Sequence, residues 1–246
     1  MEQKNSLTIP AAIIIAGALI ALALIFIKVS PNTNRPADTK NTASQTDKPN
    51  ISPVTSDDHL LGNPDAKIIV VEYSDPSCPF CKSFHKTMQT VMDEYGKTGK
   101  VALVYRHFIT VAVDDLGREY HKNASNEAHA FECAGSVGGN DKFFEFADKF
   151  YDLTPSVTGA TPEGFDQSKL PEVAKSVGID VDAFNSCMAS GKFKQKIITQ
   201  HEDGIKAGVA GTPYSFLVTK SGTIVPINGA YPITQMKKAI DALLVE

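Results

Sequence analysis

The chain has 246 residues, 42% of them hydrophobic, which is enough for one sizeable domain with additional segments. Its formal charge of −4 and the absence of long runs of one sign argue against a nucleic-acid-binding surface. No repeat with a period of about 20 to 50 residues is present, which argues against solenoid and propeller folds.

The first candidate element is a membrane anchor at residues 10–28. Residues 11–27 contain no polar side chain, and about 17 residues at about 1.5 Å each would span about 25 Å, the thickness of a thin hydrocarbon core. The apolar region of a cleaved signal peptide is usually shorter, about 7 to 15 residues, and ends at a site of small residues. Here the run ends in "IFIKVSPN". We therefore expect a short tail at residues 1–9 and a retained anchor, with a cleaved signal peptide as the alternative.

A linker is predicted at residues 29–59, because this segment is rich in Pro, Asn, Thr, Ser and Asp and cannot bury enough apolar surface to fold. More Lys and Arg side chains follow the anchor than precede it, and the positive-inside rule by itself would place the large domain in the cytoplasm. The chemistry described below favours the opposite side. We therefore expect a single-pass protein of the cell membrane with its catalytic domain on the extracytoplasmic side.

The folded part begins with a predicted β-α-β unit. Residues 68–73 form an apolar run broken only by Glu72, which is typical of a strand buried on both faces. The segment "KSFHKTMQTVMDEYGKTGK" has apolar residues at helical spacing, and "KVALVYRHFI" predicts a second strand. A right-handed crossover would make the two strands parallel. This arrangement places a C-x-x-C motif, Cys78 and Cys81, at the junction between the first strand and the helix.

The remainder predicts a helical insertion followed by a hairpin and a helix. From about residue 115 to residue 206 the pattern is helical, in five pieces interrupted by a loop, "TPSVTGATPEGFDQSK". Residues 212–232 contain two short β runs joined by a Lys-Ser-Gly turn, and an amphipathic helix closes the chain. The order β-α-β, helical insertion, β-β-α is that of a thioredoxin fold split by a helical subdomain. We assign this α/β domain to residues 60–246.

The C-x-x-C motif predicts an exchange site. Cys78 would lie at the start of a helix, where unpaired N–H groups and the helix dipole stabilise a thiolate, and Pro79 suits the first helical position. Cys81, nearly one turn on, could then resolve a mixed disulfide formed at Cys78. A zinc site would normally need four Cys or His ligands, and the other two cysteines are isolated in the sequence. We expect no metal and no cofactor. Three nearby polar residues are interpreted as structural: His85, Arg106 and His107.

Several segments resemble, in order, the thiol–disulfide oxidoreductases of the DsbA type, over about residues 58–245. The segments that carry this resemblance are "LLGNPDAKIIVVEYSDPSCPFCKSFH", "VYRHF", "NEAHAFECAG", "DKFFEFADKFYD", "GVAGTPYSFLV" and "INGAYP". The resemblance implies a thioredoxin-like fold with a helical insertion and an enzyme that exchanges thiols and disulfides in proteins.

The resemblance also implies roles for five further residues. Thr212 and Pro213 would form a loop that faces the dithiol, with a cis bond before Pro213; an ordinary turn proline is the alternative. Glu72 would be a buried acid that assists proton transfer to Cys81, or else an edge-facing residue. Cys133 and Cys187 would form a second disulfide, whose loop of about 55 residues could contribute about 4 kcal/mol; free buried cysteines are the alternative.

We therefore expect a monomeric oxidase that introduces disulfides into exported, cysteine-containing proteins and is re-oxidised by a membrane redox partner. A reductase or isomerase of the same fold is the first alternative, because the direction depends on how strongly the Cys78 thiolate is stabilised. A membrane-tethered binding or chaperone module with a non-essential dithiol is the second.

Overall fold

The computed structural model describes residues 49–110, 112–113, 119–155 and 164–245. The predicted tail, the predicted anchor at residues 10–28 and most of the predicted linker lie outside these residues. In the part of the chain that is described, no helix has both the length and the apolar character needed to cross a bilayer.

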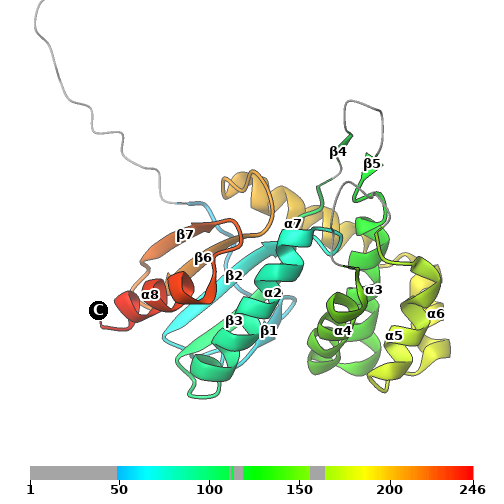
Figure 1. Cartoon of the computed structure of the whole chain (residues 1–246), viewed down its shortest axis with the longest axis horizontal. Coiled ribbons are helices and arrows are strands. Elements are labelled where there is room, and N and C mark those ends of the chain that lie inside the picture. Colours follow the sequence, from blue (N-terminus) through cyan, green and yellow to red (C-terminus); the bar gives the residue numbers. More distant parts are fainter. Residues whose placement is uncertain (1–48, 111, 114–118, 156–163, 246) are drawn as a thin grey trace, which may run out of the picture. The chain divides into compact units, whose positions relative to one another are not determined.

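The core of the domain is a mixed five-stranded sheet with the strand order β1-β3-β2-β6-β7 (Figure 1). Its strands are β1 (His59–Leu61), β2 (Ile68–Ser74), β3 (Val101–His107), β6 (Tyr214–Thr219) and β7 (Ile224–Asn228). A small hairpin is formed by β4 (Ala112–Val113) and β5 (Glu119–Tyr120). The helices are α2 (Pro79–Val91), α3 (Ala124–Gly138), α4 (Asn140–Leu153), α5 (Leu170–Ser176), α6 (Val181–Ser190), α7 (Lys194–Lys206) and α8 (Ile233–Leu244).

The central strand is β2, which pairs in parallel with β3 and antiparallel with β6. Because both of its edges and both of its faces are covered, six of its seven residues are buried, as the apolar run predicted. The pairing with β3 through α2 is the predicted β-α-β unit, and β6, β7 and α8 form the predicted β-β-α unit.

Alternate residues of the sheet pack into two hydrophobic clusters, one on each face. Ile68 and Val70 contribute to the larger cluster with α2, α8 and the aromatic residues of α3 and α4. Val71 and Tyr73 face the other cluster, which contains Ala207 just after α7. Figure 1 shows α2 and α8 across the same face of the sheet. The large aromatic share of the first cluster comes from the helical insertion: Phe131, Phe143, Phe146, Phe150 and Tyr151.

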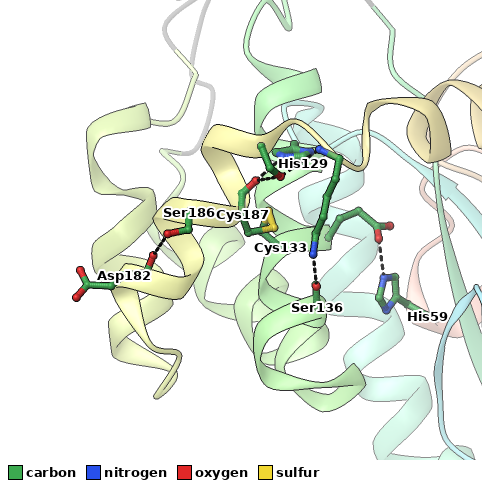
Figure 2. The surroundings of a disulfide bond; sticks show 10 residues. His59, His129, Cys133, Ser136, Asp182, Ser186 and Cys187 are labelled. Atoms are coloured by element: carbon green, nitrogen blue, oxygen red, sulfur yellow. Dashed lines mark hydrogen bonds and ion pairs between the residues drawn. A yellow bond between two sulfur atoms is a disulfide. The ribbon is translucent and has the colours of Figure 1, made fainter.

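The insertion is closed by a disulfide between Cys133 in α3 and Cys187 in α6 (Figure 2). The Cα atoms of the two residues are 5.7 Å apart, within the usual range for a disulfide. His129, one turn before Cys133, places its Nε2 3.3 Å from the carbonyl oxygen of Cys187. A second link between these helical regions is the hydrogen bond that Lys192 donates to Ser136, at 2.8 Å.

The N-terminal boundary of the packed domain differs from the expectation. Residues 49–58 were expected in the linker, but Ile51 and Val54 pack against the cluster that faces α7. The buried guanidinium of Arg106 donates to the carbonyl oxygens of Ser52 and Pro53, at 3.0 and 3.1 Å. Because Arg106 bonds to backbone oxygen atoms, the amino-acid composition of residues 49–58 gives no indication that this segment is packed against the domain.

The same guanidinium forms ion pairs with two carboxylates from distant parts of the chain. Asp58 is 2.8 Å from Nε of Arg106, and Asp203 of α7 is 3.0 Å from Nη1. Arg106 was interpreted as structural from the sequence, and its contacts here join the N-terminal segment, β3 and α7. Three strands were not expected from the sequence at all, namely β1 and the two strands of the β4–β5 hairpin that precedes the helices of the insertion.

Removing the disulfide is expected to lower stability without changing the fold. Replacing both Cys133 and Cys187 with Ala frees a loop that spans a sequence separation of 54 residues, so the free energy of unfolding should fall by about 4 kcal/mol in the chain-entropy model. Urea denaturation followed by circular dichroism measures the difference between the oxidised wild type and the double variant. Reduced wild-type protein, which lacks the bridge but keeps both side chains, is the matched control. A loss below about 1 kcal/mol would show that the bridge contributes little to stability.

Candidate active site

Cys78 lies at the N-cap of α2, with Pro79 at the first helical position. Its backbone is extended, with φ −78° and ψ 122°, and its carbonyl accepts the first helical hydrogen bond from Lys82 at 3.1 Å. The side chain is 5% exposed, and that of Cys81, in the first turn, is fully buried. Both thiols are free. The nucleophile predicted from the sequence is therefore the thiol nearer to solvent, at the positive end of a helix.

The loop before β6 faces the dithiol. The peptide bond between Thr212 and Pro213 is cis, and the carbonyl oxygen of Thr212 is 3.5 Å from Sγ of Cys78. Because Pro213 has no N–H group, it presents no competing donor beside the sulfur atoms. The structure therefore places Thr212 and Pro213, which the resemblance assigned to the loop facing the dithiol, next to Cys78.

The two thiols differ strongly in acidity. The pKa of Cys78 is lowered to about 6, chiefly because the Cys81 thiol donates a hydrogen bond to the thiolate. Burial acts in the opposite direction, while backbone N–H groups of the helix and the side chain of Thr212 add to the lowering. The pKa of Cys81 is raised well above its ordinary value by burial and by its bond to Cys78. At neutral pH the site therefore holds one thiolate, on Cys78, and one thiol.

Glu72 lies on the central strand, opposite Tyr105 of β3 and Ser215 of β6. Its side chain is 2% exposed. Burial raises the pKa of Glu72 to about 7, although the Ser74 hydroxyl and the charge on His85 oppose the rise. His85 is held by Asp148, whose Oδ1 is 2.6 Å from Nε2 of the imidazole. Glu72 is thus a core residue rather than the edge-facing residue that the sequence left possible.

Two buried tyrosines connect Glu72 electrostatically to the dithiol. The charges of both Glu72 and Cys81 raise the pKa of Tyr105 and of Tyr151, in addition to the larger effect of burial. The Ser74 hydroxyl lies close to both Glu72 and Cys81, and the hydroxyls of the two tyrosines lie close to each other. A polar region therefore lies inside the core between the carboxyl group and the resolving thiol.

A second group of polar residues surrounds the loop that precedes Cys78. The carboxylate of Asp75 accepts from the Ser77 N–H at 2.9 Å, and its Oδ2 is 2.9 Å from Nδ1 of His121. The Ser77 hydroxyl donates to Glu127 of α3 at 2.5 Å. Burial raises the pKa of Glu127 to about 7.

These four residues were not identified from the sequence. Asp75 stands at the end of a strand, three residues before the nucleophile, and that position was a usable signal. His121 and Glu127 are 46 and 50 positions away from their partners in the loop. No local pattern could have placed them there, because the contacts depend on how the insertion packs.

One group of potential metal ligands is present among the described residues, and it lies outside this site. It consists of His129, Cys133 and Cys187. Because the two sulfur atoms are joined in the disulfide, they are not available as thiolate ligands.

Comparison with known proteins gives consistent matches over the described domain. A family model described as thioredoxin matches residues 54–242. A proposed protein-disulfide oxidoreductase of Rickettsia bellii is 28% identical over 199 residues, which cover 78% of this chain and 67% of the relative.

Solved structures give the same picture. Wolbachia pipientis α-DsbA1 has a TM-score of 0.62 and 25% identity, covering 78% of this chain and 92% of its own. Bacillus subtilis BdbD has a TM-score of 0.64, covering 80% and 98% of the two chains. Its identity of 19% makes this a likeness of fold alone. Together the matches confirm the predicted α/β fold with a helical insertion.

The acidity of Cys78 is expected to depend on the hydrogen bond from Cys81. Cys81→Ala removes the donor and should raise the pKa of Cys78 by about one unit, whereas Cys81→Ser keeps a hydroxyl donor and should raise it less. Thiolate absorbance at 240 nm, recorded against pH on the full chain, measures both variants. Equal pKa values in the two variants would show that this hydrogen bond is not the main cause.

Glu72 is expected to make folding stability fall as pH rises. Its pKa is raised from 4.5 to about 7, so the unfolded chain loses this proton at lower pH than the folded domain, and stability decreases between about pH 4.5 and pH 7. Glu72→Gln should remove this contribution, which is about 3 kcal/mol at pH 8. The measurement is urea denaturation of the wild type and of Glu72→Gln at pH 4.5 and pH 8. Comparing the stability difference between the two proteins at the two pH values cancels any pH-independent effect of the amide. A pH-independent difference would contradict the assignment.

Proposed function

The chain belongs to the thioredoxin family and is a DsbA-like thiol–disulfide oxidoreductase, and on this basis we propose that it introduces disulfide bonds into exported proteins. The observation that carries the oxidising direction is the stabilised thiolate of Cys78. In an exchange protein, anything that stabilises the reduced form makes the disulfide form a stronger oxidant. The hydrogen bond from Cys81 and the helix N-terminus both act on the reduced form.

The proposed reaction has two exchange steps. A substrate thiolate attacks Sγ of Cys78 in the Cys78–Cys81 disulfide; this bond breaks, a mixed disulfide forms, and Cys81 leaves with the electron pair and takes up a proton. A second substrate thiolate attacks the substrate sulfur of the mixed disulfide, and Cys78 leaves as a thiolate. The substrate loses two electrons and releases two protons to solvent, while Cys81 takes up one proton, so the net reaction releases one proton.

Glu72 is proposed to supply the proton that Cys81 takes up. With a pKa of about 7 it is about half protonated at neutral pH and largely protonated at lower pH, and it lies in the same polar region of the core as Cys81. A departing Cys81 thiolate in this buried place would be costly without a proton donor. Glu72 is recharged from solvent after each cycle.

Exported polypeptides with reduced cysteines are the proposed substrates. Phe80, between the two cysteines, is 66% exposed and offers an apolar contact next to the nucleophile. The backbone of Thr212, just before Pro213, is proposed to pair with an extended peptide in the manner of an added strand. Both contacts are independent of the substrate's folded structure, which suits a catalyst that acts on newly exported chains.

The location proposed for this activity is the extracytoplasmic face of the cell membrane, where residues 10–28 would anchor a monomeric domain. The apolar run at residues 11–27 supports the anchor. The disulfide between Cys133 and Cys187 supports an oxidising compartment. Catalytic turnover in this direction requires a membrane redox partner that accepts two electrons from the Cys78–Cys81 dithiol.

The competing functions differ in measurable ways. A reductase or isomerase of the same fold needs an electron donor in place of the oxidising partner, and its dithiol would be less oxidising. A tethered binding or chaperone module would retain its effect on clients after Cys78→Ser. The acidic thiol at a helix N-terminus favours the oxidising direction over reduction or isomerisation, and it favours an exchange enzyme over a binding module.

The reduction potential of the full chain in mild detergent is the deciding measurement. Thioredoxin has a thiol pKa of about 7 and a reduction potential of about −270 mV, whereas DsbA has a thiol pKa of about 3.5 and a potential of about −120 mV. Interpolation between these two proteins to a pKa of about 6 gives an expected reduction potential of about −230 mV or more oxidising. Equilibration with glutathione buffers measures it. A value near −270 mV would contradict the oxidase.

The exchange mechanism itself is tested with a matched pair of variants in the same chain. Cys78→Ser should abolish oxidation of a reduced client, while Cys81→Ser should accumulate mixed disulfides at Cys78 that are visible on non-reducing gels. Recovery of no adducts from Cys81→Ser would argue for a non-enzymatic binding role.

A further inference from the structure

Asp75 is a buried acidic residue in the loop that leads to the dithiol. Its side chain is fully buried, and its backbone contacts both cysteines. The N–H of Asp75 is 3.4 Å from Sγ of Cys81, and its carbonyl oxygen accepts from the N–H of Cys78 at 3.0 Å. Because Oδ1 also accepts from the N–H of Ser77, this one residue sets the conformation of the loop that carries the nucleophile.

A negative charge at this place opposes the reaction unless it is balanced. A buried carboxylate is costly without partners, and a nearby negative charge raises the pKa of a thiol. Thr110 donates to Oδ2 with its N–H at 2.8 Å and with its hydroxyl at 2.9 Å. These neutral donors satisfy the oxygen atom but leave the charge in place.

Among the described residues, His121 is the cationic partner of Asp75. Its Nδ1 is 2.9 Å from Oδ2 of Asp75, and its side chain is 19% exposed. The groups that face it from the neighbouring elements are Asp75 and Cys78 around the start of α2, Thr110 after β3, and Glu127 on α3.

The backbone of His121 holds the ring in this position. Its φ is 58°, in the left-handed region that non-glycine residues seldom adopt and that Asn, Asp and His tolerate best. Its carbonyl oxygen accepts from the N–H of Ala124 at 3.0 Å. The chain thus turns at His121 directly into α3, and the packing of α3 fixes the turn.

We propose that His121 is a positioning residue for the exchange reaction, whose imidazolium balances the buried Asp75 carboxylate and thereby keeps the Cys78 thiolate stable. This role deepens the proposed function and rests on it. The loop conformation needs the Asp75 carboxylate, but that charge by itself would make Cys78 less acidic. His121 allows the loop to keep the carboxylate without this loss of acidity.

The role has a defined dependence on pH. The hydrogen bond to Asp75 raises the pKa of His121, burial opposes this, and the charges of Asp75, Cys78 and Glu127 add to the rise. The imidazolium is therefore present below its raised pKa and is lost as pH rises through it. Glu127, with a pKa of about 7, gains a negative charge as pH rises through that value. Both changes make the Cys78 thiolate less stable, so the Cys78–Cys81 disulfide should become a weaker oxidant at alkaline pH.

The test removes the charge while keeping the turn and the hydrogen bond. In His121→Asn the side chain tolerates the left-handed backbone and offers a neutral donor near the place of Nδ1. We expect the pKa of Cys78, measured by absorbance at 240 nm on the full chain, to rise by about one unit. The equilibrium constant with glutathione should shift about tenfold toward a less oxidising dithiol, which corresponds to about 30 mV.

The matched control is the double variant Asp75→Asn/His121→Asn, in which neither charge remains. Its Cys78 pKa should return toward the wild-type value, since the charge that His121 balances is gone. An unchanged pKa in folded His121→Asn, or an equal rise in the double variant, would overturn the proposal. Should His121→Asn fail to fold, the single variant Asp75→Asn removes the carboxylate charge and should not raise the pKa of Cys78; a raised pKa in that variant would also overturn the proposal.

This result is separable from the proposed function. The thiolate titration needs no client and no redox partner, so it reports on His121 even if the wild-type potential contradicts the oxidase. Conversely, an oxidising wild type with an unchanged pKa in His121→Asn would leave the function standing and reject the role of His121.

Discussion

The pairing of β2 with β3 on one edge and β6 on the other determines where the groups of the active site lie. This pairing buries Glu72 and sets it opposite Tyr105 and Ser215. The same strand ends at Ser74, so the loop from Asp75 to Cys78 starts from a fixed point. Because a shift in register by one residue would exchange the two faces of the strand, the position of the buried acid and that of the nucleophile are set together.

The site is built at a cost to stability that other parts of the domain offset. Glu72 and Glu127 both have their pKa raised to about 7 by burial, so each destabilises the fold at alkaline pH. The disulfide and most of the aromatic residues of α3 and α4 pack in the insertion, whereas Tyr151 of α4 and Glu127 of α3 lie close to the site. The insertion thus supplies both stability and polar groups near the thiols.

The sequence was sufficient where the signal is local or periodic. The apolar run of β2, the helix after the cysteines and the five helical pieces of the insertion follow from spacing alone, and the C-x-x-C position follows from them. It was insufficient where contacts join distant residues. Nothing near His121 or Glu127 indicates a partner about 50 positions away, and the packing of residues 49–58 depends on bonds from Arg106 to backbone oxygens. The strand β1, with three residues, is too short to give a pattern.

The disulfide between α3 and α6 has a consequence for how the protein matures. Newly synthesised chains carry four reduced cysteines, and the two in the insertion must lose two electrons before the bridge exists. For a protein with the activity proposed above, an oxidised copy can remove those electrons from the next one. Each molecule would then be a client before it is a catalyst, and the supply of active protein would depend on the copies already finished.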